Sequence, residues 1–161
     1  MVRESEVYPL LLDELERKFK PKTPIGGSYH LELTFTGEFS NSLKREVHHD
    51  IVFSFLKRTS PDITGFLKSI FGTDFITVEI KRRKLVLEDI YQAKRYADLF
   101  NAKYGFLLSS KPVPEEIKRL ANVSSILRKS KGGDIRMAQF DENTGKIFDY
   151  TWFPANQFEE L

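Results

Sequence analysis

The sequence predicts an α/β fold in which a mixed central β-sheet is flanked by helices and a β-hairpin closes the chain. Apolar residues recur at helical spacing in some segments and alternate with polar residues in others. One helical segment connects two predicted strands, which indicates a parallel crossover in a sheet that otherwise contains hairpins. With 161 residues, 40% of them hydrophobic and 30% charged, the chain fits a single domain over residues 1–161.

The N-terminal part is predicted to form one helix followed by two strands. Val7–Lys18 has its leucines at helical spacing, with polar residues before it that suit a helix start. Residues 29–36 alternate between apolar and polar, which is typical of a half-buried strand. Leu43–Leu56 is predicted as a second strand from the spacing of its valines, isoleucine and phenylalanines.

The central part is predicted to form a hairpin followed by a helix. A short strand, Asp62–Leu67, leads through a turn that contains Gly72 into a longer strand, Asp74–Arg82. Leu87–Phe100 then has apolar residues at the spacing of one helix face.

The C-terminal part is predicted to form a strand, a basic helix and a final hairpin. The strand is Tyr104–Leu108 and the helix is Pro114–Lys129. The hairpin joins Ile135–Phe140 to Ile147–Phe153, and Gly145 in its turn is free to adopt a positive φ.

Composition restricts the chemistry that the chain can perform. It contains no Cys and three His, which excludes a disulfide scaffold, a thiolate zinc site and a Cys nucleophile, so a metal would need oxygen ligands. No stretch approaches the roughly 20 apolar residues of a membrane span, and the start MVRESEVYP is too acidic for a secretory signal. We therefore expect a cytoplasmic protein without a membrane partner. The net charge of +2 does not by itself indicate a nucleic-acid partner.

The central hairpin contains the residues that indicate a function. Side chains alternate along a strand, so Glu79 and Lys81 share one face of theirs, and the hairpin brings Asp62 toward them from the neighbouring strand. Two converging carboxylates repel each other unless a cation joins them, and hard oxygen ligands select Mg²⁺ or Mn²⁺. Lys81 would orient or activate a water beside that ion. The hairpin therefore predicts a metal site that acts on a phosphate group.

Other interpretations of these residues stay open. Glu79 and Lys81 are also typical of an exposed ion pair, worth about 0.2–1 kcal/mol, in a structural or interaction domain without activity. Asp50, in the segment HHDIVFSF, is a rival acidic residue if the strands pair in a different register.

The order of these elements resembles the PD-(D/E)xK nuclease superfamily, which includes restriction endonucleases and archaeal Holliday-junction resolvases. The resemblance rests on Pro61-Asp62 followed, after an apolar run, by Glu79-Ile80-Lys81 and a helix. In that helix Gln92 and Tyr96 match the Q-x-x-x-Y motif of many members. The resemblance covers residues 60–120.

This resemblance implies a restriction-endonuclease-like core and Mg²⁺- or Mn²⁺-dependent hydrolysis of phosphodiester bonds by an endonuclease, with DNA preferred to RNA. It implies that Asp62, Glu79 and the backbone carbonyl of Ile80 bind the metal and that Lys81 positions the water. It also implies that Gln92, at the edge of the site, touches nucleic acid or the groups that surround the metal ligands.

Many members also have a Glu in the first helix that joins the metal site. Glu6 is preferred here to Glu14 and Glu16 because it opens the helix, although a first-turn acid also suits the helix dipole. A two-fold dimer would let each subunit cut one strand. The alternative is a catalytically silent nucleic-acid-binding or protein-interaction module of the same fold.

Overall fold

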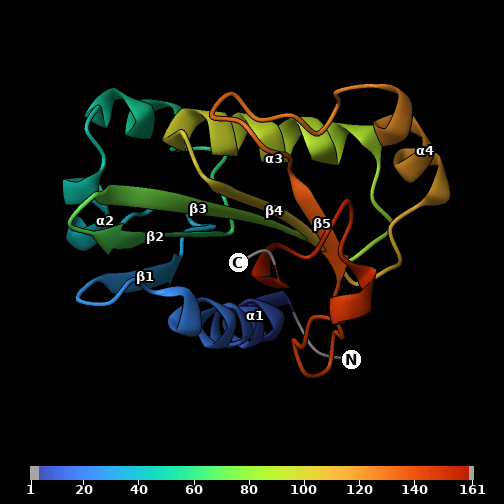
Figure 1. Ribbon diagram of the computed structural model, residues 1–161, viewed down its shortest axis with the longest axis horizontal. Helices are drawn as coiled ribbons and strands as arrows, with labels where there is room; N and C mark the ends of the chain where they lie inside the picture. Colours follow the sequence, from blue (N-terminus) through green and yellow to red (C-terminus); the bar gives the residue numbers. More distant parts are fainter. Residues whose placement is uncertain (1–3, 160–161) are drawn as a thin grey trace.

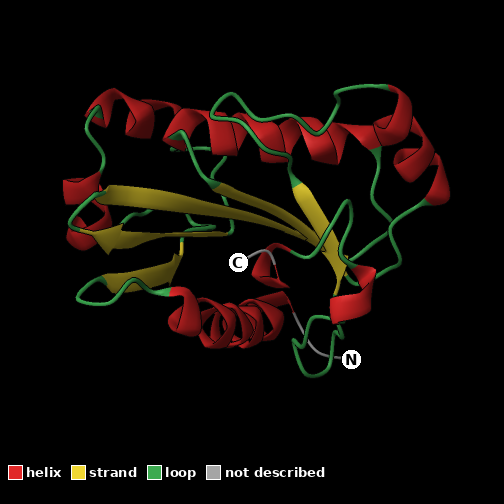
Figure 2. Ribbon diagram, in the orientation of Figure 1, coloured by secondary structure: helices red, strands yellow, loops and turns green. Residues whose placement is uncertain are grey.

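The computed structural model describes residues 4–159 and has an α/β architecture. A five-stranded mixed sheet lies between helices on both of its faces, which confirms the predicted general fold (Figure 1; Figure 2). Helix α1 covers one face of the sheet, and helix α3 runs along the other (Figure 1). Within this described range, no helix is both long and apolar enough to cross a membrane.

The elements follow one another in an order that mixes hairpins with crossovers. The strands are β1 Ser28–Leu33, β2 Ile63–Ser69, β3 Gly72–Lys81, β4 Tyr104–Ser109 and β5 Arg136–Gln139. The helices are α1 Glu4–Phe19, α2 Asn41–Glu46, α3 Leu87–Phe100 and α4 Glu115–Val123, and short 3-10 turns occupy η1 Lys20–Lys22, η2 Asp50–Phe55, η3 Asp149–Thr151 and η4 Gln157–Glu159.

The sheet has the strand order β1-β2-β3-β4-β5. Strands β1, β2 and β3 pair antiparallel, whereas β3, β4 and β5 pair parallel. The parallel pairs require the crossovers through α3 and α4, since a tight turn can join only antiparallel neighbours. Strand β3 is therefore central, with an antiparallel partner on one side and a parallel partner on the other.

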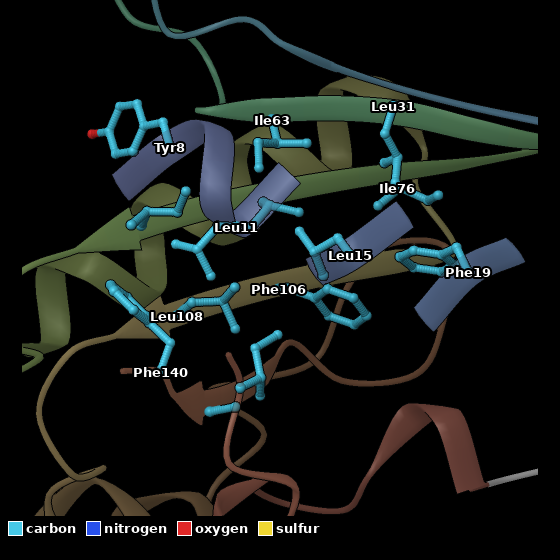
Figure 3. Close-up of a cluster of buried hydrophobic side chains, with 14 of the residues drawn as sticks. Tyr8, Leu11, Leu15, Phe19, Leu31, Ile63, Ile76, Phe106, Leu108 and Phe140 are labelled. Atoms are coloured by element: carbon cyan, nitrogen blue, oxygen red, sulfur yellow. The ribbon is translucent and has the colours of Figure 1, made fainter. Parts of the chain in front are cut away.

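The alternation predicted for β3 divides its side chains between two apolar cores. Ile76, Val78 and Ile80 are buried in the cluster formed with α1, part of which Figure 3 shows. Phe75, on the opposite face of the strand, packs with the cluster formed by α3. Because Glu79 is an even number of residues from Phe75, it also lies on the α3 face.

The predicted strand Leu43–Leu56 is wrong, because this segment forms α2 and η2 instead. The Ser40 hydroxyl accepts a hydrogen bond from the Leu43 backbone N–H at 3.1 Å and so begins a helix. Phe53 packs against Phe100 of α3 with a ring-centroid separation of 6.0 Å. Val47, Val52, Phe53 and Leu56 therefore pack in the cluster of α3 rather than extend the sheet, whereas Ile51 and Phe55 are exposed.

The C-terminal part also differs from the prediction. Helix α4 ends at Val123, not at Lys129, which is buried and donates from its ammonium to the Gly132 carbonyl at 2.7 Å. Residues 147–153 form no regular strand, and their β-bridges to the chain around β5 are isolated ones at Ile147 and Phe153.

The side chain of Thr151 explains why the predicted C-terminal hairpin does not form. The Gln139 backbone N–H donates to the Thr151 hydroxyl at 2.9 Å, so a side chain occupies a position that a ladder carbonyl would take. Thr151 Oγ1 donates in turn to the Phe148 carbonyl at 2.6 Å, which favours the 3-10 turn η3. Gly145 has a φ of 73°, as its predicted place in the turn requires.

Gly65 is the position in β2 where a larger residue is least tolerated. A Cβ there would lie 2.1 Å from the His30 carbonyl oxygen of the paired strand β1. We expect Gly65→Ala to lower the free energy of unfolding by about 1–3 kcal/mol, because backbone must move to relieve the clash. Chemical denaturation would measure this, with Ser69→Ala at the end of the same strand as the control. Equal stability of Gly65→Ala and the wild type would contradict the β1–β2 pairing.

Candidate active site

Asp62 is fixed at the point where the chain enters β2. Its backbone N–H donates to the Val78 carbonyl at 2.9 Å, and its Oδ2 accepts from the Ile80 backbone N–H at 2.7 Å. The preceding carbonyl, of Pro61, accepts from the Thr34 hydroxyl at 2.6 Å. The carboxyl group is buried, with the residue 6% exposed, and lies against the end of β3. The predicted approach of Asp62 to this strand is thus found.

The carboxyl groups of Glu79 and Asp62 are both buried and contact each other. The residue is 5% exposed and its Oε2 atom is buried without a hydrogen-bond partner. Burial, followed by the hydrogen bond and the negative charge of Asp62, raises the pKa of Glu79 to about 10, against the opposing charge of Lys81. At neutral pH and without a cation, the Glu79 carboxyl therefore holds a proton next to the Asp62 carboxylate.

Lys81 is the last residue of β3 and lies on the same face as Glu79. Its ammonium is 3.8 Å from Asp89 Oδ1 in α3, and its side chain is 20% exposed. The alternative of an exposed Glu79–Lys81 ion pair does not hold, because Glu79 is buried and the carboxylate paired with Lys81 is that of Asp89.

Asp89 joins two basic residues to the start of α3. It accepts two hydrogen bonds from the Arg83 guanidinium, both at 2.8 Å, and one from the Val86 backbone N–H at 2.8 Å. Burial acts to raise the pKa of Asp89, but these hydrogen bonds and the neighbouring cations lower it below its ordinary value. Asp89 is therefore a carboxylate that holds Arg83 in place and faces Lys81.

A cavity of about 750 Å³ opens at this end of the sheet. Its walls come from α1, the start of β2, the ends of β3 and β4, and the turn after β5. The residues that line it are Tyr8, Asp62, Ile80, Lys81, Arg82, Arg83, Lys111 and Glu142. Three predicted site residues, Asp62, Ile80 and Lys81, thus share one cavity. Glu79 is not among the lining residues and adjoins the cavity through its contact with Asp62.

Gln92 is not among the residues that line the cavity. Its side-chain amide donates to the Tyr96 hydroxyl at 3.3 Å, one helical turn further along α3. Tyr96 is 1% exposed, and burial first, then the charges of Glu79 and Asp62, raises its pKa. The Tyr96 hydroxyl therefore lies near the two carboxyl groups. The contact of Gln92 with nucleic acid stays a prediction.

The first helix does not bring an acid to the pair within the part of the chain that the structure describes. Glu6 is exposed in the first turn of α1 and is absent from the cavity wall. Glu14 is buried, but its carboxylate bonds to the Ile147 backbone N–H at 2.7 Å and to Arg17. Glu16 is half-buried. The role of Glu6 as a metal ligand remains a prediction, and Tyr8 is the residue of α1 that lines the cavity.

Other residues of this region were either misplaced or missed. The rival acid Asp50 is exposed in η2, outside the sheet, so it takes no part in this pairing. Lys111 follows β4, and it was predictable in principle because β4 and β3 are parallel and end at the same edge. Glu142 comes from a turn distant in sequence, and no local pattern indicates its place.

The donor set fits a hard divalent cation better than it fits a purely structural role. A buried carboxyl oxygen of Glu79 without a partner, next to a second carboxylate, is an arrangement that a cation would satisfy. Among the side chains that the structure describes, those of residues 6–159, no group of three or more Asp, Glu or His could hold a metal ion. Backbone carbonyl and water oxygens would complete the coordination, as is usual for Mg²⁺.

Compared with known proteins, the chain matches no protein-family model, no curated protein and no solved structure.

Proposed function

We propose that this protein is a metal-dependent nuclease that hydrolyses phosphodiester bonds in DNA, on a restriction-endonuclease-like core. The observation that carries the proposal is the buried pair of Asp62 and Glu79, with one Glu79 oxygen unpartnered, beside a cavity lined by basic side chains. The order of the elements from α1 to β4, αβββαβ once the short helix α2 between β1 and β2 is set aside, and the mixed sheet are consistent with such a core.

Asp62, Glu79 and the backbone carbonyl of Ile80 would hold one Mg²⁺ or Mn²⁺ ion. The bound ion would supply Lewis-acid activation of a water and neutralise charge on the phosphate group. Glu79 must lose its proton for this role, so metal binding should release protons and strengthen as the pH rises.

Lys81 acts on the water in this proposal. Its ammonium, next to Glu79 along the strand and facing Asp89, would donate a hydrogen bond that orients the attacking oxygen. Asp89, 3.8 Å from the Lys81 ammonium, would help to hold that group in place. Arg82 and Lys111 supply positive charge for the substrate phosphates.

The proposed substrate is DNA, and RNA is the less favoured choice. Cleavage of both strands of a duplex would be performed by a two-fold dimer in which each subunit supplies one site. A catalytically silent module of the same fold is the second candidate, because no third acid among the described side chains joins Asp62 and Glu79 in a group that could hold a metal ion. Such a module would bind DNA without cleaving it.

Metal binding provides the first test. We expect millimolar Mg²⁺ or Mn²⁺ to raise the melting temperature measured in EDTA, because the ion binds the folded state alone. At an ion concentration one hundred times Kd, the free energy of unfolding should rise by about 2.7 kcal/mol. Each kcal/mol raises the melting temperature of a domain of this size by roughly 2–4 °C. Differential scanning fluorimetry would measure it at pH 8.

Two variants make this measurement specific to the site. Asp62→Asn removes a ligand and should lose the metal-dependent rise. Glu116→Gln neutralises an exposed carboxylate outside the cavity, whose side chain is 78% exposed, and should retain it. A wild-type protein whose melting temperature is unchanged by either ion would contradict the proposed metal site.

A further inference from the structure

The cavity contains an ion pair whose acidic member, Glu142, has no role in the proposed hydrolysis. Arg82 follows Lys81 in the chain, and its Nε donates to Glu142 Oε1 at 3.0 Å. Both residues line the cavity that holds Asp62. The pair therefore links the end of β3 to the turn of residues 141–146.

The turn that carries Glu142 has a defined conformation. The Asp141 backbone N–H donates to the Lys146 carbonyl, and the Gly145 N–H donates to the Asp141 carbonyl, both at 2.8 Å. A Cβ on Gly145 would lie 2.6 Å from the Leu10 Cβ of α1, so the turn packs closely on that helix. Glu142 is thus placed against Arg82 by the fold.

Glu142 is an anion in a wall that is otherwise rich in cations. Of these, Arg83 is already bound by Asp89 through two hydrogen bonds. No carboxylate among the described side chains, residues 6–159, forms an ion pair with Lys111. Lys111 lines the same cavity as Arg82, so one anionic ligand could contact both cations if it displaced the Glu142 carboxylate from the Arg82 Nε–H group.

A carboxylate and a phosphate oxygen compete for the same guanidinium edge. Both are anionic acceptors of charge-assisted hydrogen bonds, and one Nε–H group cannot bond fully to both. We propose that Arg82 and Lys111 form a phosphate subsite beside the metal site, and that Glu142 occupies it until a backbone phosphate of nucleic acid takes its place. This inference rests on the proposed function and extends it to a residue that weakens substrate binding.

The test is the effect of Glu142→Gln on DNA affinity. Removing the competing charge should tighten binding of a labelled duplex by about three- to tenfold, as expected for the loss of one partly exposed ion pair and one repulsive charge. Fluorescence anisotropy in EDTA at low salt would measure Kd without cleavage. Glu116→Gln is the matched control, since it makes the same charge change at a carboxylate 3.8 Å from Lys84, and we expect less than about a twofold effect.

A double-variant comparison separates the subsite from a general charge effect. In an Arg82→Ala background, Glu142→Gln should change Kd no more than the Glu116→Gln control does. Circular dichroism melting of each variant would show that the fold is retained, and Arg82→Lys, which keeps the charge but loses the planar fork, is the milder substitute.

Several results would overturn this inference. One is a DNA affinity of Glu142→Gln equal to that of Glu116→Gln, and another is a gain in affinity from Glu142→Gln that persists in the Arg82→Ala background. A third is loss of the Mg²⁺-dependent rise in melting temperature in Glu142→Gln, which would make Glu142 a metal ligand. Absence of any DNA binding or cleavage by the wild type would remove the proposed function together with the subsite. Normal cleavage with no effect of Glu142→Gln would remove the subsite alone.

Discussion

Lys81→Ala is expected to reduce Mg²⁺-dependent DNA cleavage by about 10²–10⁴-fold, the range for loss of a positioned proton-transfer or charge-stabilising group. The reason is that Lys81 lines the same cavity as Asp62 and, unlike Lys111, also follows Glu79 on the same face of β3. The measurement is the initial rate on labelled single strands, duplexes, flaps and four-way junctions with Mg²⁺ or Mn²⁺.

The fold should survive this substitution. Lys81 ends its strand, and Asp89 keeps its bonds to Arg83 and to the Val86 N–H when the Lys81 ammonium is removed. Lys84→Ala is the matched control, because it removes the same charge from a side chain that is 67% exposed and outside the cavity wall. Cleavage by Lys81→Ala at the Lys84→Ala rate would remove Lys81 from the mechanism.

Glu79→Gln is expected to stabilise the metal-free protein at alkaline pH and to abolish the stabilisation by metal. The pKa of Glu79 rises from its ordinary value of 4.5 to about 10 in the folded protein, chiefly through burial and then through Asp62. Between these values the folded protein keeps a proton that the unfolded chain has released. The wild-type free energy of unfolding should therefore fall as the pH rises through this window, by at most about 1.4 kcal/mol per pH unit.

Gln cannot release a proton, so the variant should lack this pH dependence. The Glu79→Gln and wild-type proteins should have similar stability near pH 5 in EDTA, whereas the variant should be the more stable near pH 8. Addition of Mg²⁺ or Mn²⁺ should reverse that order, because only the wild type has both carboxylate ligands.

Urea denaturation at both pH values, with and without the ion, would measure these differences. Glu116→Gln should follow the wild type throughout, since its carboxylate is solvent-exposed. If Glu79→Gln and wild type showed parallel stability profiles between pH 5 and pH 8, the buried, protonated state of Glu79 would be wrong.

The hairpin and helix around the site could be predicted because their determinants are local. Alternation over Phe75–Ile80 defines one apolar face for each core, and Leu87–Phe100 begins and ends as its spacing predicts. The hairpin then places Asp62 opposite the end of β3, where its carboxylate bonds to the Ile80 N–H. The approach of Asp62 to Glu79 follows from strand pairing, which a sequence pattern can indicate.

Residues 43–56 and 147–153 could not be predicted in this way. Their apolar residues are spaced compatibly with strands, yet the first segment covers α3 and the second is interrupted by η3. In each case a hydroxyl decides the local structure, through the Ser40 bond to Leu43 and the Thr151 bond to Gln139. Whether such a bond forms depends on which groups the rest of the fold brings near.

The remainder of the cavity wall was also beyond sequence reasoning. Tyr8, Lys111 and Glu142 come from α1, the end of β4 and the turn of residues 141–146. They are separated along the chain by more than any helix or strand period spans. Gln92 and Tyr96 have the predicted helical spacing, but only the packing of α3 on β3 brings the Tyr96 hydroxyl near Glu79.

By itself, the sequence determined the hairpin of β2 and β3, the following helix and the sharing of one strand face by Glu79 and Lys81, because hydrogen bonds and side-chain alternation within one element set these features. The tertiary structure alone decided the burial of the Glu79 carboxyl group against Asp62, the bonding of Asp89 to Arg83 and the position of Glu142 on Arg82. Burial and ion pairing depend on how distant segments pack, and that packing removes the water that would otherwise surround these charges.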